Sequence, residues 1–374
     1  FDLMHFTQTR IATIDSFVVL FILWAVYFML YWFKMDYFHT PFLKTLVPLG
    51  LSGLFMGLSI ASKWTGCYNA VGLALIFFWG LFRRYRIWKQ AKDTVEDYQA
   101  ALLKTSKKKQ AESPLPEPTD ALAIAKQGRT MIYTVLSCFV FFVFIPLLIY
   151  YLSFIPYFAY NGGVTVKKVA DTLTYMLDYH SEPGRGMDHP YYSPWYQWPF
   201  IGKPMFYFQS MFNTPSATSA IWAMGNPAVW WVGLIGLLGV IALAIRQHVI
   251  SSVQLTEDRR LSGQVSLSLF PRADEPRFAL LIILFLVQYL PWVLVPRGTY
   301  IYHYFPSVPF IILCTGLCLD KLHDKKPKAA LILGAVLLAA ALVLFIGFFP
   351  YASGWPVPQS WMNLMRWFPG WLYY

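Results

Sequence analysis

Charged residues are scarce in this sequence, and their scarcity excludes an ordinary soluble domain. Of 374 residues only 13% are Asp, Glu, Lys or Arg, whereas 57% are hydrophobic. Soluble domains usually carry about 25% charged residues. A soluble core cannot bury so much apolar surface, so lipid must be the solvent for much of it. The 15 Trp and 24 Tyr fit this interpretation, because their rings favour the boundary between lipid and water.

Cysteine is also rare, and several catalytic motifs are missing. Cys138, Cys314 and Cys318 fall in apolar segments and Cys67 stands alone, so we expect no disulfide framework. The sequence has no serine nucleophile elbow, no phosphate-binding P-loop and no CxxC pair. It also lacks the regularly spaced arginines of a voltage sensor and the broken-helix repeats of a transporter.

Eight apolar segments approach the length of roughly 20 residues that crosses the hydrocarbon of a bilayer. They are Thr13–Phe33, Leu46–Ala61, Gly66–Phe82, Met131–Phe154, Ala228–Ile245, Phe278–Val295, Tyr304–Leu319 and Ala329–Phe349. All should be helices, because lipid leaves an open strand without hydrogen-bond partners. The sequence has no signal peptide and no initiator Met, and we expect it to be a fragment whose N-terminal part is missing.

The net charge of +11 is concentrated in loops beside the apolar segments. This pattern follows the positive-inside rule and attraction to anionic headgroups, and we expect no nucleic-acid partner. The basic segment Arg83–Arg129 is predicted to be cytoplasmic, helical over Trp88–Leu103 and otherwise disordered, with Arg246–Arg277 and Lys321–Lys328 on the same side. The long segment Pro156–Gly225 has few cations and should be external.

The alternation gives a domain organisation. It comprises helices 1–3 (residues 1–82), the basic loop (83–129), helix 4 (130–155), the external loop with short helices (156–225), helices 5–8 (226–350) and an aromatic tail (351–374). The tail is predicted to be an external interfacial helix. Close helix packing is predicted at Gly53 and Gly57, which form a GxxxG, and along Gly233, Gly236 and Gly239.

Polar residues at the external ends of the predicted spans are the candidates for function, because charge near lipid is costly. In TRIATIDSF, Arg10 is expected at the mouth of the first span and Asp15 about one and a half turns deeper. In SIASKWTG, Lys63 lies in a tight turn between two spans. Each cation could bind a lipid phosphate or simply extend its charge to the interface.

The external run Tyr179–Pro199 combines imidazoles, carboxylates and aromatic rings, a combination suited to sugars. Its candidates are His180, Asp188, His189, Tyr191, Trp195 and Trp198. The alternative is an ordered loop lying on the membrane. In VPRGTYIYHYFP, Arg297 and His303 flank the mouth of the seventh span, and a guanidinium matches phosphate in bidentate geometry. The spacing of the external histidines matches no helical metal motif, so we expect no metal site.

These motifs occur in an order that resembles the protein O-mannosyltransferase family. TRIATIDSF, GLFMGLSIASKWTG, DHPYYSPWYQWP and RGTYIYHYFPSVPF carry the resemblance, which covers nearly the whole chain except Arg83–Arg129. It implies a GT-C-type polytopic helix bundle that transfers mannose, with inversion, from polyprenyl-phosphate mannose to Ser or Thr of secreted or membrane proteins. It also implies a plasma-membrane enzyme of prokaryotic type, active on the outer face, with no cofactor. Divalent metal dependence stays open.

The resemblance assigns the candidates to roles. Arg10, Lys63, Arg297 and His303 would bind the donor phosphate, and His180, Asp188, His189, Tyr191, Trp195, Trp198 and Tyr304 would bind sugar or acceptor. The family's adjacent Asp-Glu pair has no match here, so the catalytic base is expected upstream of Phe1, with Asp15 as an auxiliary. Two alternatives remain: a related transferase acting on a lipid or cell-wall glycan, and a membrane transporter or scaffold.

Overall fold

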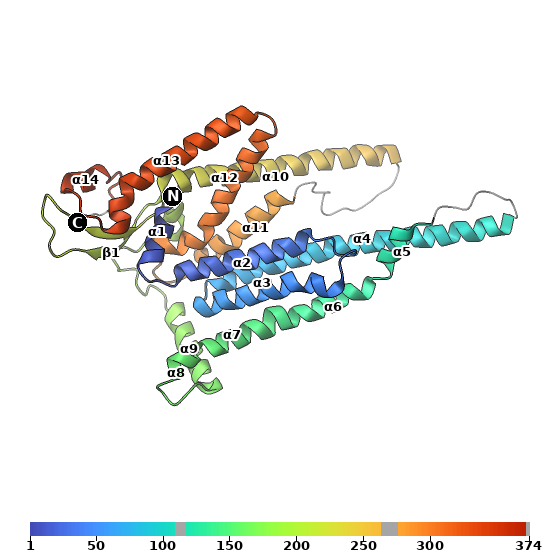
Figure 1. Ribbon diagram of the computed structural model, residues 1–374, viewed down its shortest axis with the longest axis horizontal. Helices are drawn as coiled ribbons and strands as arrows, with labels where there is room; N and C mark the ends of the chain where they lie inside the picture. Colours follow the sequence, from blue (N-terminus) through green and yellow to red (C-terminus); the bar gives the residue numbers. More distant parts are fainter. Residues whose placement is uncertain (109–116, 263–275, 372–374) are drawn as a thin grey trace. The chain divides into compact units, whose positions relative to one another are not determined.

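The computed structural model describes residues 1–108, 117–262 and 276–371 (Figure 1). These residues form two compact units. Unit 1 comprises Phe1–Val19 and Ala170–Tyr374, and unit 2 comprises Leu20–Val169. Within these described residues, eight helical segments are long and apolar enough to cross a membrane, which confirms each of the eight predicted spans. The protein is therefore a multi-pass membrane protein.

Every regular element in the described residues of unit 2 is a helix. After the shared α2 (Asp15–Lys34), it contains α3 (Phe42–Ser62), α4 (Gly66–Lys108), α5 (Thr119–Ala125), α6 (Gly128–Phe139), a π-helical turn (Val140–Phe144), α7 (Ile145–Ser153), α8 (Ile155–Phe158) and the start of α9 (Val166–Ser181). The π-turn ends two residues before Pro146, which has no N–H to donate to a carbonyl of the preceding turn and so disturbs the regular α-helical ladder.

Small residues let α3 approach the helix that runs from α6 to α7, as the GxxxG predicts. A Cβ atom at Gly53 would lie 2.1 Å from the carbonyl oxygen of Phe141, and one at Gly57 would lie 2.9 Å from Cα of Pro146. In unit 1, the predicted glycine face of α10 packs on α12 in the same way, since a Cβ at Gly236 would lie 2.7 Å from the backbone N of Thr315. Both packing predictions are confirmed.

Unit 1 gathers its irregular segments at one end of its helices. It contains α1 (Leu3–Arg10), strands β1 (Met205–Gln209) and β2 (Ala220–Ala223), α10 (Pro227–Ser262), α11 (Arg277–Tyr289), α12 (Val308–His323), α13 (Pro327–Ser353), α14 (Gln359–Leu364) and three 3₁₀ turns, η2 (Trp195–Phe200), η3 (Leu290–Leu294) and η4 (Ile301–Ser307). The strands pair antiparallel, with Met205 opposite Ala223. This hairpin was not expected in an all-α fold.

Two predicted segments differ from the structure. The helix expected over Trp88–Leu103 is the continuation of α4, which runs unbroken from its membrane span, and α5 follows where disorder was expected; residues 109–116 lie outside the described residues. The aromatic tail contains only the six-residue α14 and folds back on unit 1. Its Trp371 is fully buried and donates its indole N–H to the carbonyl of Ile201 at 2.6 Å. Trp355, Trp361 and Trp367 of the same tail are exposed, so its interfacial position stays a prediction.

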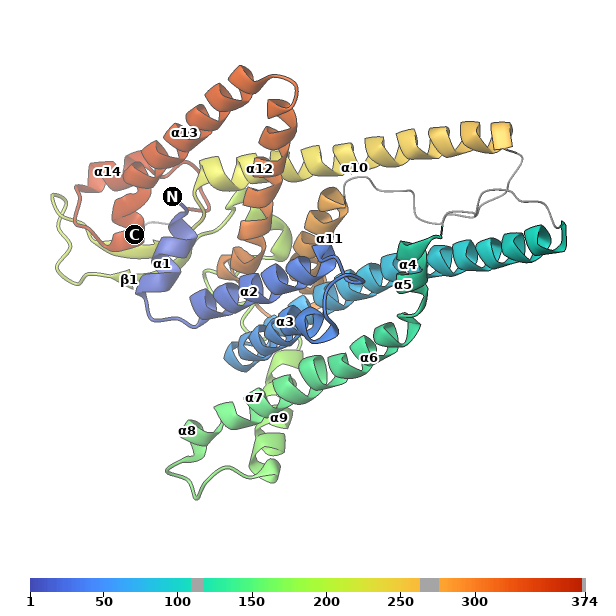
Figure 2. The ribbon, with the colours of Figure 1, turned by 45° about the vertical axis from the view of Figure 1, so that its right-hand side comes forward.

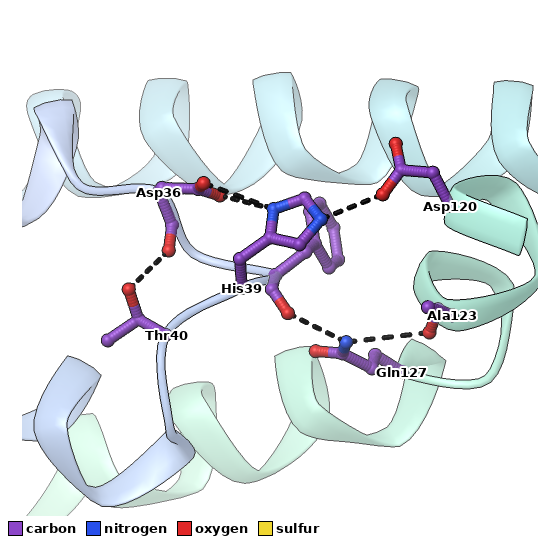
Figure 3. Close-up of polar contacts among 7 residues, drawn as sticks. Asp36, His39, Thr40, Asp120, Ala123 and Gln127 are labelled. Carbon is purple, nitrogen blue, oxygen red and sulfur yellow. Dashed lines mark hydrogen bonds and ion pairs between the residues drawn. The ribbon is translucent and has the colours of Figure 1, made fainter.

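A polar network fixes α5 at the basic end of unit 2. Figure 3 shows the His39 ring between two carboxylates: Nδ1 lies 2.9 Å from Asp36 and Nε2 lies 2.8 Å from Asp120 on α5. The side chain of Gln127 donates to the carbonyl of Phe38 at 2.8 Å. Both imidazole nitrogens can donate only when the ring is protonated, and the hydrogen bonds to Asp36 and Asp120 raise the pKa of His39.

This network predicts pH-dependent local stability. Because the folded-state pKa of His39 is raised above its ordinary 6.5, its contribution is complete below about pH 6.5 and is lost as the pH rises through the folded value. The protection factors of the α5 amides, that is, their exchange rates relative to the intrinsic rate at each pH, should therefore fall as the pH rises through the folded-state pKa. His39→Gln should remove the pH dependence and His323→Gln, an exposed histidine of unit 1, should keep it. An unchanged profile in His39→Gln would contradict the assignment.

Helix packing yields a second prediction. Gly53→Ala should destabilise the protein by about 1–3 kcal/mol, because its methyl group would overlap the backbone of Phe141. Gly316→Ala is the matched control, since a Cβ there meets nothing within 4 Å and alanine favours a helix by about 0.5–1 kcal/mol. Thermal unfolding in detergent should show a lower Tm for the first variant only. Equal shifts would refute the close contact.

Candidate functional site

Two loops of unit 1, residues 182–193 and 296–300, run side by side and are called here the paired loops. Four hydrogen bonds join them: Gly184 N to Pro296 O (3.0 Å), Gly298 N to Arg185 O (2.8 Å), Ser193 N to Thr299 O (3.0 Å) and Thr299 Oγ1 to Ser193 O (2.9 Å). The two most distinctive polar motifs of the sequence, more than 100 residues apart, are thus held together by backbone contacts.

Glycine makes this pairing possible. Gly184 and Gly186 adopt φ angles of 76° and 74°, which residues with a Cβ rarely adopt. A Cβ at Gly298 would lie 2.3 Å from the carbonyl oxygen of Gly186, so only glycine fits where these two loops meet. The flanking residues Arg297 and His189 are therefore carried on a fixed backbone.

The exposed face of the paired loops includes His189, which is exposed, and Tyr300, which is half-buried. Their rings meet edge to face with centroids 5.2 Å apart, and the His189 ring lies 5.7 Å from that of Tyr191. His189 Nδ1 accepts a hydrogen bond from the backbone N–H of Tyr191 at 3.2 Å. Because Nδ1 accepts, the neutral ring carries its proton on Nε2, where it can donate to a ligand.

Arg297 supplies positive charge beside these rings. It is half-buried, and its Nη1 donates to the carbonyl of Gly298 at 3.1 Å, which leaves other guanidinium donors for a ligand. Burial raises the pKa of Tyr300, the charge of Arg297 lowers it, and the nearby Asp188 carboxylate raises it. The Tyr300 hydroxyl thus remains a proton donor with both a cation and a carboxylate within electrostatic range.

A second charged contact borders the paired loops. Arg185 Nε donates to Glu182 at 2.5 Å, and the guanidinium lies over the ring of Tyr179, 4.4 Å from its centroid. Tyr179 in turn packs edge to face on His180, at 5.3 Å. His180 is half-buried at the C-terminal end of α9. These residues border the exposed face but do not form its centre.

Three predicted contact residues lie in the core instead. Trp198 is fully buried and its indole N–H is shared by the Ser193 carbonyl and hydroxyl, at 3.0 and 3.1 Å. His303 is only 4% exposed, with its ring centroid 4.2 Å from that of Trp292. Tyr304 is fully buried. All three are buried in this structure, and their contacts with sugar and phosphate stay predictions.

The remaining aromatic candidates are partly accessible. Tyr191 stacks on Phe206 of β1 at 5.5 Å and meets Trp222 of β2 edge to face at the same distance. The hairpin that sequence reasoning missed therefore supports a candidate residue. Trp195 is half-buried, and its backbone carbonyl accepts a hydrogen bond from the Tyr289 hydroxyl at 3.0 Å.

The sequence predicts Arg10 and Asp15 on one helix, but the structure has them on two separate helices. Arg10 ends α1, and Asp15 begins α2 after a turn in which Ala12 has a positive φ of 58°. Arg10 is exposed, lies over the ring of Phe6 at 5.0 Å and donates to the carbonyl of Ser353 at 3.4 Å. Asp15 is 9% exposed and lies within the electrostatic range of the Tyr207 and Tyr302 hydroxyls.

Sequence reasoning missed the polar core around Asp15. The buried Gln8 donates to the Tyr207 hydroxyl at 2.9 Å and accepts from the Thr13 hydroxyl at 2.6 Å. Burial raises the pKa of Tyr207, and the charge of Asp15 adds to that effect. Tyr207 lies in the apolar run MFYFQ, whose alternation gave no sign of function. The signal available was Gln8 itself, a polar side chain beside an apolar span.

Lys63 belongs to unit 2. It follows α3 in the predicted tight turn, where the backbone N–H of Gly66 donates to its carbonyl at 2.9 Å. A Cβ at Gly66 would lie 2.6 Å from the carbonyl carbon of Ser59, so the turn needs glycine. The neighbouring Trp64 donates its indole N–H to the Tyr150 hydroxyl at 2.8 Å.

The paired loops provide a structural test. Gly298→Ala should separate the two loops, because its methyl group would overlap the carbonyl of Gly186, at a cost of about 1–3 kcal/mol. Limited proteolysis within residues 182–193 should become faster. Met187→Ala, which truncates an exposed side chain of the same loop, should cleave at the parent rate. Parent-like resistance in Gly298→Ala would show that the loops do not depend on that contact.

Two family models match the chain. The C-terminal four-transmembrane region of protein O-mannosyltransferase matches residues 165–371, which is more than half of the chain. The dolichyl-phosphate-mannose–protein mannosyltransferase model matches residues 1–160. The two matches together include the paired loops, the Asp15 region and the Lys63 turn.

Relatives and a solved structure agree with these matches. A polyprenol-phosphate-mannose–protein mannosyltransferase of Mycolicibacterium smegmatis is 22% identical over 86% of this chain and 57% of its own length. Dolichyl-phosphate-mannose–protein mannosyltransferase 5 of Candida albicans is 26% identical over 53% of this chain and 27% of its own length. This chain thus spans only part of the relatives that it matches.

The fold is also found in an experimental structure. The Saccharomyces cerevisiae protein O-mannosyltransferase Pmt1–Pmt2 complex bound to the sugar donor has a chain with a TM-score of 0.65 and 12% identity to this one. The similarity covers 96% of this chain and 74% of that chain. At this identity it establishes the shared membrane fold.

Proposed function

Because this chain belongs to the protein O-mannosyltransferase family, we propose that it is the part of a mannosyltransferase that holds the donor phosphate and the sugar. The proposed donor is polyprenyl-phosphate mannose, which enters from the bilayer. The proposed acceptors are Ser and Thr hydroxyls of secreted or membrane proteins. We place the reaction on the outer face of the plasma membrane, where the positive-inside rule puts the paired loops.

The proposal rests on one arrangement, in which Arg297 is held beside Tyr300 and His189 by the paired loops. A lipid-linked sugar phosphate combines an anion, a hydroxyl-rich ring and an apolar tail. Arg297 offers charged donors to the anion, His189 Nε2–H and Asp188 offer hydrogen bonds to hydroxyls, and the aromatic rings offer apolar faces. These groups meet on a backbone whose position is fixed by glycine.

The proposed chemistry is a direct displacement. The acceptor hydroxyl oxygen forms a bond to the sugar carbon as the bond from that carbon to the phosphate oxygen breaks, which inverts the carbon. The acceptor proton passes to a carboxylate base, and the electron pair of the broken bond leaves with the polyprenyl phosphate. Arg297 stabilises the charge that develops on this leaving group. Lys63 and Arg10 are proposed as further cations for the phosphate.

The remaining residues divide by their burial. His180, Asp188, His189, Tyr191 and Trp195 are proposed to contact the sugar or the acceptor, because each keeps accessible surface. Trp198, His303 and Tyr304 are proposed to hold the paired loops from below. Asp15 is proposed as an auxiliary whose charge acts on the nearby hydroxyls of Tyr207 and Tyr302.

The test measures transfer of mannose from polyprenyl-phosphate mannose to a Ser/Thr peptide by the full-length protein. Arg297→Ala should lower the rate by on the order of 100-fold, because the developing phosphate charge loses a donor. His189→Ala should lower it less and mainly raise KM for the donor. Arg366→Ala is a control of equal charge change, since Arg366 is an exposed residue of the tail, and it should retain the parent rate.

Two results would overturn the proposal. Parent-like rates in both Arg297→Ala and His189→Ala would remove the paired loops from the reaction. Transfer to a lipid or glycan acceptor with none to the peptide would assign the chain to a related transferase with another acceptor.

A further inference from the structure

Unit 2 contains a groove between α4 and α6 that the proposed transfer reaction does not use. It has a volume of about 680 Å³, within the range of roughly 300–1,000 Å³ typical of small-molecule sites. Its walls are Phe78, Leu81, Phe82, Tyr85 and Trp88 of α4 and Gly128, Arg129, Met131, Ile132 and Val135 of α6. We call it the α4–α6 groove.

The contact between α4 and α6 at Trp88 closes one end of this groove. A Cβ at Gly128 would lie 3.0 Å from the indole of Trp88, and the Trp88 indole N–H donates to the carbonyl of Ala125 at 3.0 Å. Figure 2 shows α5 beside α4 and α6 following from it. The ion pair between His39 and Asp120 also holds α5 in place. The closed end of the groove is therefore held in place by packing at Gly128 and by the hydrogen bond of Trp88.

The walls of the groove are apolar and accessible. Phe78 is 61% exposed and Ile132 is 59% exposed, and both belong to helices that are long and apolar enough to span a membrane. Side chains of this kind face hydrocarbon in a bilayer. The groove is thus open to lipid chains rather than to water-soluble ligands.

Positive charge stands at the closed end. Arg129 is the one charged residue among those that line the groove, and it is exposed. Lys89 and Lys92 lie four residues beyond Tyr85 and Trp88 and so continue the same face of α4. Lys92 Nζ lies 6.0 Å from the Trp88 ring centroid. An anion at the end of an apolar chain would match this distribution of charge.

The groove lies far from the candidate donor residue of unit 2. Lys63 precedes the start of α4, and Trp88 lies 22 residues after Gly66, which corresponds to roughly 33 Å along the helix. The two places are therefore at opposite membrane surfaces. A partner helix is disfavoured as an occupant, because helix contacts in lipid need small residues, and the single glycine here is covered by Trp88.

We propose that the α4–α6 groove is a binding site for one anionic phospholipid of the leaflet at the basic end of unit 2. An acyl chain lies along the aromatic wall and the headgroup phosphate pairs with Arg129. Lys89 adds to the attraction, whereas the charge of Lys92 is partly offset by Glu96, whose carboxylate lies 3.5 Å from its Nζ. This inference is independent of the proposed mannosyl transfer.

The test uses Trp88 as a reporter in vesicles that contain acyl-brominated phosphatidylglycerol or acyl-brominated phosphatidylcholine. The measured quantity is the quenching of Trp88 fluorescence alone. It is obtained by subtracting the quenching of the Trp88→Phe variant from that of the parent, because the other tryptophans contribute equally to both. Half-maximal quenching should require roughly five-fold less phosphatidylglycerol than phosphatidylcholine, as expected for a basic residue near an anionic headgroup. Arg129→Gln should abolish this difference.

Two controls separate the site from general attraction and from misfolding. Arg83→Gln removes the same charge from the opposite face of α4, where Arg83 lies over the ring of Phe33, and should keep the lipid preference. Val135→Phe should fill the groove and reduce quenching by phosphatidylglycerol, whereas Leu136→Phe, at an exposed position outside it, should not. Equal quenching by the two lipids, or an unchanged preference in Arg129→Gln, would overturn the proposal.

Discussion

The structure depends on the constraint that hydrocarbon offers no hydrogen-bond partner to a polar backbone. Eight helical segments satisfy their own backbone, and irregular segments are confined to the helix ends. The paired loops obey the same rule, because backbone groups that would otherwise need water bond to each other across the two segments. Polar chemistry is thereby collected at the ends of the helices.

Glycine converts this constraint into close packing. Gly53 brings α3 against the turn before α7, Gly236 brings α10 against α12, and Gly298 brings one loop against Gly186 of the other. The first two contacts assemble the membrane bundle, and the third positions Arg297 and His189. In each case the missing side chain allows one backbone segment to contact another. Both the helix packing and the candidate site therefore depend on glycine at a close backbone contact.

The two ends of unit 2 differ in chemistry. One carries the tight turn of Lys63, and the other carries the network of His39 and the α4–α6 groove. The basic side chains of α4 and α6 that the sequence assigns to orientation also lie beside an apolar recess. The same basic side chains can therefore set the orientation of the protein in the membrane and bind the proposed lipid headgroup.

The sequence by itself determined the eight spans and the glycine contacts, since hydropathy and small-residue spacing act locally along a helix. It could not determine which aromatic and imidazole side chains remain accessible. Trp198, His303 and Tyr304 read like Trp195 and His189 in the sequence, yet they are buried. It also missed the β1–β2 hairpin and the hydrogen bond between Gln8 and Tyr207. Burial and pairing depend on contacts between distant segments, and only the tertiary structure decides those.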